Sequence, residues 1–310
     1  MTETSSVINM AADSPKRLLV VDGNALFHRS RSALMRSMGE LTLPDGTPTT
    51  GTFGFANNLI SILGEVNPTH CLVVYDAGGN FRKSQSEEYK ANREKADDHF
   101  YREYENVKKD ILPSFGIKVV GAVGFEADDV IYTVSQNLQK DFDEIIILTC
   151  DQDILQCVTD KVKVLLFNSA KKKVMMGVEE VVEKLGVPPS LIPELKAISG
   201  DSSDNISGVK GIGPKTAIKI LSECGSDWGK VLSHPKIAPE WAKVNENLNL
   251  TKSVPVASAL EISESDLVLG TGTFQLVDSV LERYHFNTMK KRRKKILATL
   301  NINDGVKDVV

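Results

Sequence analysis

Nine carboxylates gather in five short motifs of this sequence. Three motifs, VVD, VVYD and CDQD, place an Asp at the end of an apolar run. CDQD holds a second Asp, and the other two motifs, GFEADDV and GDSSDN, hold three and two acids. The nine side chains are Asp22, Asp76, Glu126, Asp128, Asp129, Asp151, Asp153, Asp201 and Asp204. General acid–base chemistry needs far fewer carboxylates, whereas hard oxygen ligands without His or Cys suit Mg²⁺ or Mn²⁺. The set predicts two divalent ions, which together activate a water and neutralise charge building on a phosphate.

Each motif also has a simpler structural explanation. Asp22 in Asp-Gly-Asn suits a turn. The acids of GFEADDV suit the start of a helix, where they cap free N–H groups. Asp153 and Asp204 could be solvated. We favour a metal site because the predicted elements would bring the motifs together.

Those elements are apolar runs that alternate with helix-like stretches. Strands are predicted at 18–21, 71–75, 117–120, 145–150 and 162–167, and helices at 52–63 and 127–138. This alternation predicts an α/β fold with a central, mostly parallel sheet flanked by helices. The carboxyl ends of parallel strands meet at one edge, so Asp22, Asp76 and Asp151 should lie close together.

Two later segments differ from this pattern. Residues 80–112 are polar and rich in both charge signs, which predicts an exposed helical excursion with Phe100, Tyr101 and Tyr104 packed on the body. Residues 208–217, GVKGIGPKTA, predict a tight turn between two helices. Its glycines permit close approach of another backbone, and the N–H groups of the following helix favour an anion. The turn could grip a nucleic-acid backbone without reading bases, or simply connect two packed helices.

The bulk composition is that of an ordinary globular protein of 310 residues with a net charge of −4. The negative charge counts mildly against nucleic-acid binding, although metal ions would cancel much of it locally. No apolar run is long enough to span a membrane, and we see no signal peptide. The four cysteines form no CxxC pair, so we expect a reducing cytoplasm and a protein without disulfides.

Taken together, the motifs VVDGNALF, VVYDAGGNFR, YKANR, GFEADDV, CDQD, GDSSDN and GVKGIGPKTA resemble the 5′ nuclease (flap endonuclease) family. This family includes bacteriophage 5′-exonucleases and the N-terminal domain of bacterial DNA polymerase I. The resemblance covers residues 17 to about 225 and implies a PIN-like nuclease core, a helical arch and a helix–hairpin–helix. It also implies a Mg²⁺-dependent 5′-3′ exonuclease and flap endonuclease of phage replication, with two ions replaceable by Mn²⁺. Removal of RNA primers, as an RNase H activity, stays open.

The resemblance assigns roles to further residues. All nine carboxylates match the family's metal-holding set, with Asp128 also counted as catalytic. Lys90 and Arg93 match basic residues at the foot of the arch that reach the scissile phosphate and count as catalytic, and Tyr89 would stack on a terminal base. The remaining residues expected to contact DNA are Arg82, Lys83, Lys196, Gly211, Gly213, Lys215 and Lys219. Family members often hold K⁺ in the hairpin through main-chain oxygens. The basic run at 290–295 is assigned weakly to DNA rather than to an exposed helix end.

The predicted organisation is a tail at 1–16, a nuclease core at 17–185 with its arch at 82–110, a helix–hairpin–helix and C-terminal helical region at 186–300, and a tail at 301–310. We expect a monomer that binds DNA with 5′ ends or flaps, with a polymerase or single-strand-binding protein as candidate partners and no membrane. Two alternatives stay open. A non-catalytic branched-DNA-binding relative should lack metal ligands, and a metal-dependent ribonuclease should lack the hairpin.

Overall fold

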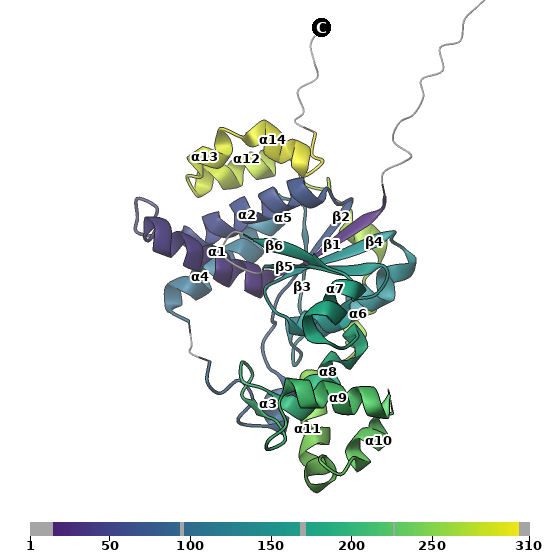
Figure 1. Ribbon diagram of the computed structural model, residues 1–310. Coiled ribbons are helices and arrows are strands. Elements are labelled where there is room, and N and C mark those ends of the chain that lie inside the picture. Colours follow the sequence, from purple (N-terminus) through teal and green to yellow (C-terminus); the bar gives the residue numbers. More distant parts are fainter. Residues whose placement is uncertain (1–14, 94–95, 168–171, 226, 304–310) are drawn as a thin grey trace, which may run out of the picture.

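A six-stranded sheet forms the centre of the protein. The computed structural model describes residues 15–93, 96–167, 172–225 and 227–303 (Figure 1). The strand order is β3-β2-β1-β4-β5-β6. Neighbouring strands are parallel except for β6, which pairs antiparallel to β5. The strands are β1 (Arg17–Asp22), β2 (His70–Val74), β3 (Lys118–Val120), β4 (Glu144–Thr149), β5 (Val162–Phe167) and β6 (Lys173–Met176). The predicted α/β class and mostly parallel sheet are confirmed, and among these strands only β6 was not predicted.

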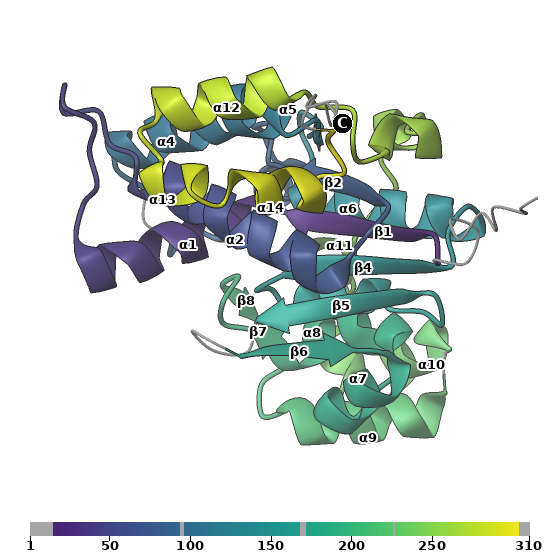
Figure 2. The same ribbon diagram turned by 90° about the horizontal axis from the view of Figure 1, so that it is seen from above.

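Helices cover both faces of the sheet, which explains why its central strands are apolar on both sides. One face buries Leu19, Val21 and Ile146 against the first helical layer. The other buries Leu18, Val20 and Ile147 against the second. The first layer contains α1 (Gly23–Met38), α2 (Thr50–Val66), α4 (Asp98–Asn106), α5 (Leu112–Ser114), α12 (Phe274–Arg283), α13 (Asn287–Lys290) and α14 (Arg293–Thr299). Figure 2 shows α12, α13 and α14 lying over α2 on this side.

The second layer begins with α6 (Ala127–Asn137) and α7 (Val178–Leu185). Below them lies a smaller unit, here called the hairpin lobe (residues 189–251) (Figure 1). It consists of α8 (Ile192–Ser199), β7 (Gly200–Asp201), β8 (Ile206–Ser207), α9 (Pro214–Cys224), α10 (Trp228–Ser233) and α11 (Trp241–Thr251). Short single-turn helices complete the fold at Leu138–Lys140, Asp153–Cys157, Pro189–Leu191, Ala238–Glu240, Ala257–Ala259 and Glu264–Leu267.

The C-terminal helices do not extend the hairpin lobe, although residues 186–300 were predicted as one region. Figure 1 shows α12, α13 and α14 at the opposite end of the molecule from α9, α10 and α11. Their apolar faces pack with α2 and α5 into the first helical layer. Burial of Leu281, Met289 and Leu297 thus completes the core of the α/β body.

The predicted helix at 52–63 is the middle of α2, and that at 127–138 is α6 with the first residue of the 3₁₀ turn that follows it. Helix α1 was not predicted, and the structural alternative considered for Asp22-Gly23-Asn24 was a turn. Asp22 instead caps α1, since its side chain accepts the N–H of Ala25. A polar residue at the end of a strand serves equally well as the N-cap of a helix.

The arch segment (residues 82–110) is helical at both ends. It starts in α3 (Phe81–Gln85) and ends in α4, which continues as a π-helical turn at Val107–Ile111. Residues 94 and 95 lie outside the described ranges. Phe100 is buried and Tyr104 is half-buried as expected, but the prediction for Tyr101 is wrong, since 51% of it is exposed.

In the described part of the chain, no helix combines the length and apolar character required to cross a membrane. Apart from residues 15–16 and 301–303, the predicted tails lie outside that part, which starts at residue 15 and ends at residue 303.

Candidate metal and nucleic-acid site

A cleft of about 940 Å³ opens at the carboxyl ends of the parallel strands. The nuclease-like motifs supply most of its polar lining. Seven of the nine predicted carboxylates line it: Asp22, Asp76, Glu126, Asp128, Asp151, Asp153 and Asp201. Four Lys and Arg side chains, Lys90, Arg93, Lys184 and Lys196, line the same cleft. The strand-end convergence inferred from the sequence therefore occurs.

The acids at the ends of β1 and β2 are held in place by hydrogen bonds from backbone N–H groups and a hydroxyl. Asp22 accepts the Ala25 N–H at 2.9 Å and the Thr149 hydroxyl at 2.7 Å. Asp76 accepts the N–H of Ala127 at 2.8 Å, which ties it to the first turn of α6. These bonds fix the orientation of each carboxylate before any ion binds.

Crowding of acids in a partly dry cleft disfavours their charged forms. Burial, reinforced by Asp151 and Asp76, raises the pKa of Asp22 to about 6. Burial and the neighbours Asp151 and Asp22 raise the pKa of Asp128 well above its usual value, and burial also raises that of Asp76. Positive charge placed among these groups would lower all three pKa values.

Two lysine ammonium groups already lie between the carboxylates. Lys90 donates to Glu126 and lies 3.6 Å from Asp204. Lys196 bridges Asp153 and Asp201, with a distance of 2.6 Å to Asp201. Although burial opposes it, the Lys196 ammonium helps to hold the pKa of Asp201 below its usual value.

The residues present fit hard divalent cations. Their donors are all carboxylate oxygens, the chemistry that Mg²⁺ prefers, and the two lysines show that the cleft accommodates positive charge at two places. Across the described residues, no three carboxylates converge tightly enough to ligate one ion as they stand. An ion that takes Glu126, Asp153 or Asp201 would displace the ammonium group that now contacts it.

Asp129 is not placed as a metal ligand, contrary to the prediction. It is fully buried, does not line the cleft, and accepts hydrogen bonds from Nη1 and Nη2 of Arg82 at 2.7 and 2.8 Å. The prediction that Arg82 contacts DNA also fails here, because only 3% of Arg82 is exposed. Sequence alone could not distinguish these two roles, since a buried ion pair and a metal ligand use the same residue types.

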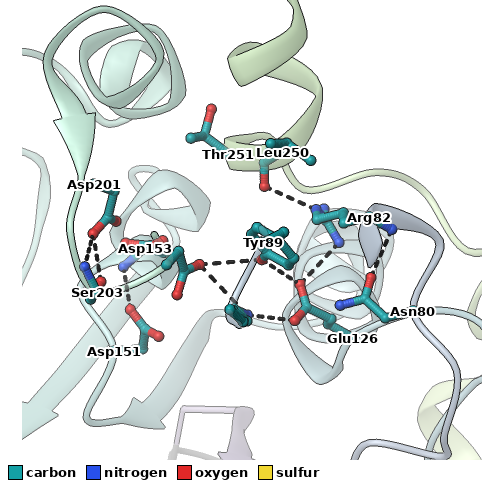
Figure 3. Close-up of polar contacts among 12 residues, drawn as sticks. Asn80, Arg82, Tyr89, Glu126, Asp151, Asp153, Asp201, Ser203, Leu250 and Thr251 are labelled. Carbon is teal, nitrogen blue, oxygen red and sulfur yellow. Dashed lines mark hydrogen bonds and ion pairs between the residues drawn. The ribbon is translucent and has the colours of Figure 1, made fainter. Parts of the chain in front are cut away.

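Tyr89 is likewise not placed to stack on a base. Only 3% of it is exposed, and its hydroxyl donates to Glu126 at 2.9 Å (Figure 3). The same hydroxyl also donates to Asp204 at 3.2 Å. Asp204 lies outside the cleft lining and also accepts from Arg93 at 2.8 Å. The arch foot is therefore tied to the acids by side chains that the resemblance assigned to substrate.

The hairpin has the predicted form. Ile212 is buried, Gly211 has a φ of +79°, and α9 starts at Pro214. Two predicted DNA contacts, Lys215 and Lys219, are exposed on α9, while Gly211 and Gly213 are exposed in the turn. Lys83 is exposed on α3.

One hairpin carbonyl already has a cationic partner. Lys243 of α11 donates its ammonium to the Gly208 oxygen at 2.7 Å, and Glu240 accepts the N–H of Lys210 at 3.2 Å. At Gly208, this arrangement does not fit a K⁺ ion bound by main-chain oxygens.

The basic run at 290–295 is partly neutralised. Lys290 contacts Glu282, Arg293 contacts Asp278 at 2.6 Å, and Arg292 donates to Asn57. It lies on α13 and α14, at the end of the molecule remote from the hairpin lobe (Figure 1). Its assignment to DNA therefore gains no support from position.

Sequence reasoning missed a relay from the arch to the acids. The Tyr104 hydroxyl donates to Asn24, and the Asn24 amide donates to Asp76. Asn24 lies two residues after Asp22 in the Asp-Gly-Asn motif, which was the available signal, but only the Asp of this motif was considered as a site residue. Arch helix α4 thus contacts a cleft carboxylate through one intervening side chain.

The fold and cleft define a two-part protein, an α/β body carrying an acidic cleft and a helical lobe carrying a glycine-rich hairpin. The 5′-3′ exonuclease N-terminal resolvase-like domain matches residues 17–186, and the 5′-3′ exonuclease C-terminal SAM fold matches residues 187–261. The chain belongs to the 5′-3′ exonuclease family.

Relatives and solved structures agree with this membership. The chain is 40% identical over 210 residues to DNA polymerase I of Chloroflexus aurantiacus, covering 66% of this chain and 22% of that protein. It spans between about a fifth and a third of the DNA polymerase I relatives it matches. It is 33% identical to a 5′-3′ exonuclease of Aquifex aeolicus, covering 91% of this chain and 96% of that one. The fold is similar to that of the bacteriophage T5 flap endonuclease in a complex with DNA and metal ions, with a TM-score of 0.61, 19% identity, and coverage of 92% and 99%.

Proposed function

We propose that the protein is a structure-specific 5′ nuclease that hydrolyses DNA phosphodiester bonds with two divalent metal ions. The observation that carries the proposal is the cleft, where five separate segments of the chain deliver seven carboxylates beside the hairpin lobe. Family membership supports the same reaction, and the T5 enzyme was solved with DNA and metal ions.

The metal-holding residues would be those that line the cleft: Asp22, Asp76, Glu126, Asp128, Asp151, Asp153 and Asp201. Two Mg²⁺ ions, with Mn²⁺ as a substitute, would supply water activation and charge neutralisation at the phosphate. Asp204, outside the lining, would instead orient Arg93 and Tyr89.

The basic side chains have a role that follows from their present partners. Lys90 and Arg93 now neutralise Glu126 and Asp204. Once ions neutralise the acids, these two cations are free to contact the scissile phosphate and stabilise the charge that develops on it. Arg93 reaches it most easily, because 53% of its side chain is exposed.

The hairpin lobe would hold the duplex next to the cleft. Lys215 and Lys219 on α9 present charge to phosphates, and the exposed N–H groups of the turn favour an anion. Such contacts read backbone and not sequence, so recognition would depend on the 5′ end or flap. A strand that begins with RNA would also fit this grip. The four cysteines are free thiols, in keeping with a reducing cytoplasm.

A 5′-end-labelled flap substrate tests the proposal. With Mg²⁺ we expect labelled fragments that end at the junction for flap cutting, or labelled mononucleotides for exonuclease action. EDTA and Asp128→Ala should both abolish the products. A protein that binds the flap tightly but leaves it intact with Mg²⁺ or Mn²⁺ would be the non-catalytic relative, and the proposed reaction would be wrong. An RNA-initiated flap in a parallel reaction measures primer removal.

A further inference from the structure

A buried arginine hydrogen-bonds to two other parts of the protein and so joins the arch segment to the first turn of α6 and to the hairpin lobe. Arg82 lies in α3 at the start of the arch segment, and all five of its N–H groups have acceptors within 3.2 Å. Two acceptors are the Leu250 and Lys252 carbonyls, at 3.0 and 2.8 Å. The others belong to Glu126, at 3.2 Å, and to Asp129. Figure 3 shows Arg82 directed between Glu126 and the Leu250 carbonyl.

Its partner Asp129 is equally saturated. Besides Arg82, the carboxylate accepts the N–H of Val254 at 3.0 Å and that of Glu126 at 3.2 Å. Four accepted bonds fill the approximately four lone-pair positions of a carboxylate. No oxygen of Asp129 is left for a metal ion, and the side chain is completely buried.

These contacts link the arch, the acidic helix and the hairpin lobe. Glu126 and Asp129 bracket the first turn of α6, which also carries Asp128 toward the cleft. Leu250 and Lys252 lie at the end of α11, the helix whose Asn247 holds the Ala197 and Ser207 carbonyls of the lobe. Moving the Arg82 guanidinium would release all three parts at once.

We infer that Arg82 and Asp129 form a positioning pair that sets the first turn of α6 against the arch foot and the hairpin lobe, and that neither binds DNA or metal. The inference rests on the proposed two-ion reaction. If the Arg82 guanidinium moved out to contact a phosphate, the fully buried Asp129 carboxylate would lose its cationic partner, which is strongly unfavourable. A lysine cannot replace Arg82, because one ammonium cannot span acceptors arranged around a planar fork.

The first arm of the test separates the positioning role of Asp129 from a ligand role. Mn²⁺ affinity is measured by electron paramagnetic resonance for wild type, Asp129→Asn and the matched variant Asp128→Asn. We expect Asp129→Asn to bind Mn²⁺ within about threefold of wild type. Its kcat should fall about 10- to 100-fold, as when a group that orients a ligand is lost. Asp128→Asn should lose Mn²⁺ affinity. Equal losses in both variants would overturn the inference.

The second arm separates positioning from DNA contact. Lys83 is the neighbouring, exposed cation, so Lys83→Met and Arg82→Lys form a contrasting pair. Arg82→Lys should keep its DNA affinity in EDTA within about threefold while kcat falls about 10- to 100-fold. Lys83→Met should show weaker DNA binding in EDTA than Arg82→Lys. If Arg82→Lys keeps the wild-type kcat, or if it binds DNA more weakly, the pair does not have a positioning role.

A third measurement needs neither metal nor DNA. Because the pair acts as one unit, the double variant Arg82→Lys/Asp129→Asn should lower the Tm no more than the worse single variant does. Additive losses of Tm contradict the inference. If Arg82→Lys does not fold, a Mn²⁺-bound crystal of the wild type decides, since Asp129 must stay on Arg82. Wild-type protein that neither binds Mn²⁺ nor cuts DNA would defeat the proposed function, whereas the double-variant result judges the pair separately.

Discussion

Lys196→Met should strengthen binding of a divalent ion in the absence of DNA. The Lys196 ammonium bridges Asp153 and Asp201, and the three side chains are only 21%, 15% and 9% exposed. An ion that takes these carboxylates must first displace the ammonium. Methionine keeps the length and apolar stem of the side chain and removes the competitor.

The size of the effect follows from the charged hydrogen bond that the ammonium must break before an ion can enter. A hydrogen bond to a charged group contributes about 1.5–3 kcal/mol. Lys196 regains hydration when it leaves, so we take the lower end of that range, about 1.5 kcal/mol. This corresponds to about a tenfold lower Kd for the ion that takes Asp153 and Asp201.

Isothermal titration with Mn²⁺ measures this Kd for wild type and variant. Lys184→Met is the matched control, because Lys184 lines the same cleft and, in the described part of the chain, forms no ion pair with a carboxylate. It should shift the Kd far less. Unchanged or weaker Mn²⁺ binding in Lys196→Met would refute the idea that the ammonium occupies the ion's place.

Three further results are expected. The pKa of Asp22 in the folded protein is raised to about 6, so its protonation stabilises the metal-free protein below about pH 4, and this stability is lost as the pH rises through 6. Asp22→Asn should therefore abolish cleavage and raise the free energy of unfolding of the metal-free protein in urea at pH 7.5 by about 1–3 kcal/mol. A lower free energy of unfolding would contradict this sign. Lys215→Ala should weaken DNA binding equally for all sequences and reduce the slope of log K against log salt by about 1, and an unchanged slope would exclude a phosphate contact. Because Lys243 already donates to the Gly208 carbonyl, the DNA affinity of the wild type should be the same in Na⁺ and K⁺. Lys243→Met should make the DNA affinity depend on K⁺. Wild-type protein that needs K⁺ to bind DNA would disprove this role of Lys243.

The sequence was sufficient where a pattern repeats along one element. Apolar runs ending in Asp22, Asp76 and Asp151 predicted parallel strands and the edge at which they meet, because strand direction alone fixes that edge. The hairpin was predicted for a similar reason, since Gly211 and Pro214 impose local backbone conformations.

It was insufficient where a side chain's role depends on a partner far along the chain. Asp128 and Asp129 are adjacent in sequence, yet one lines the cleft and the other binds Arg82, because successive residues of a helix point about 100° apart. Arg82 and Lys83 diverge for the same reason, and only the 250–254 segment reveals which one is buried.

The most direct test is an anomalous difference map from a crystal of the wild-type protein soaked in Mn²⁺. We predict two peaks in the cleft, contacted by Asp22, Asp128, Asp151 and Asp201, with Lys90 and Lys196 displaced from their carboxylates. A cleft without anomalous density, its lysines still paired with the acids, would contradict the two-ion account.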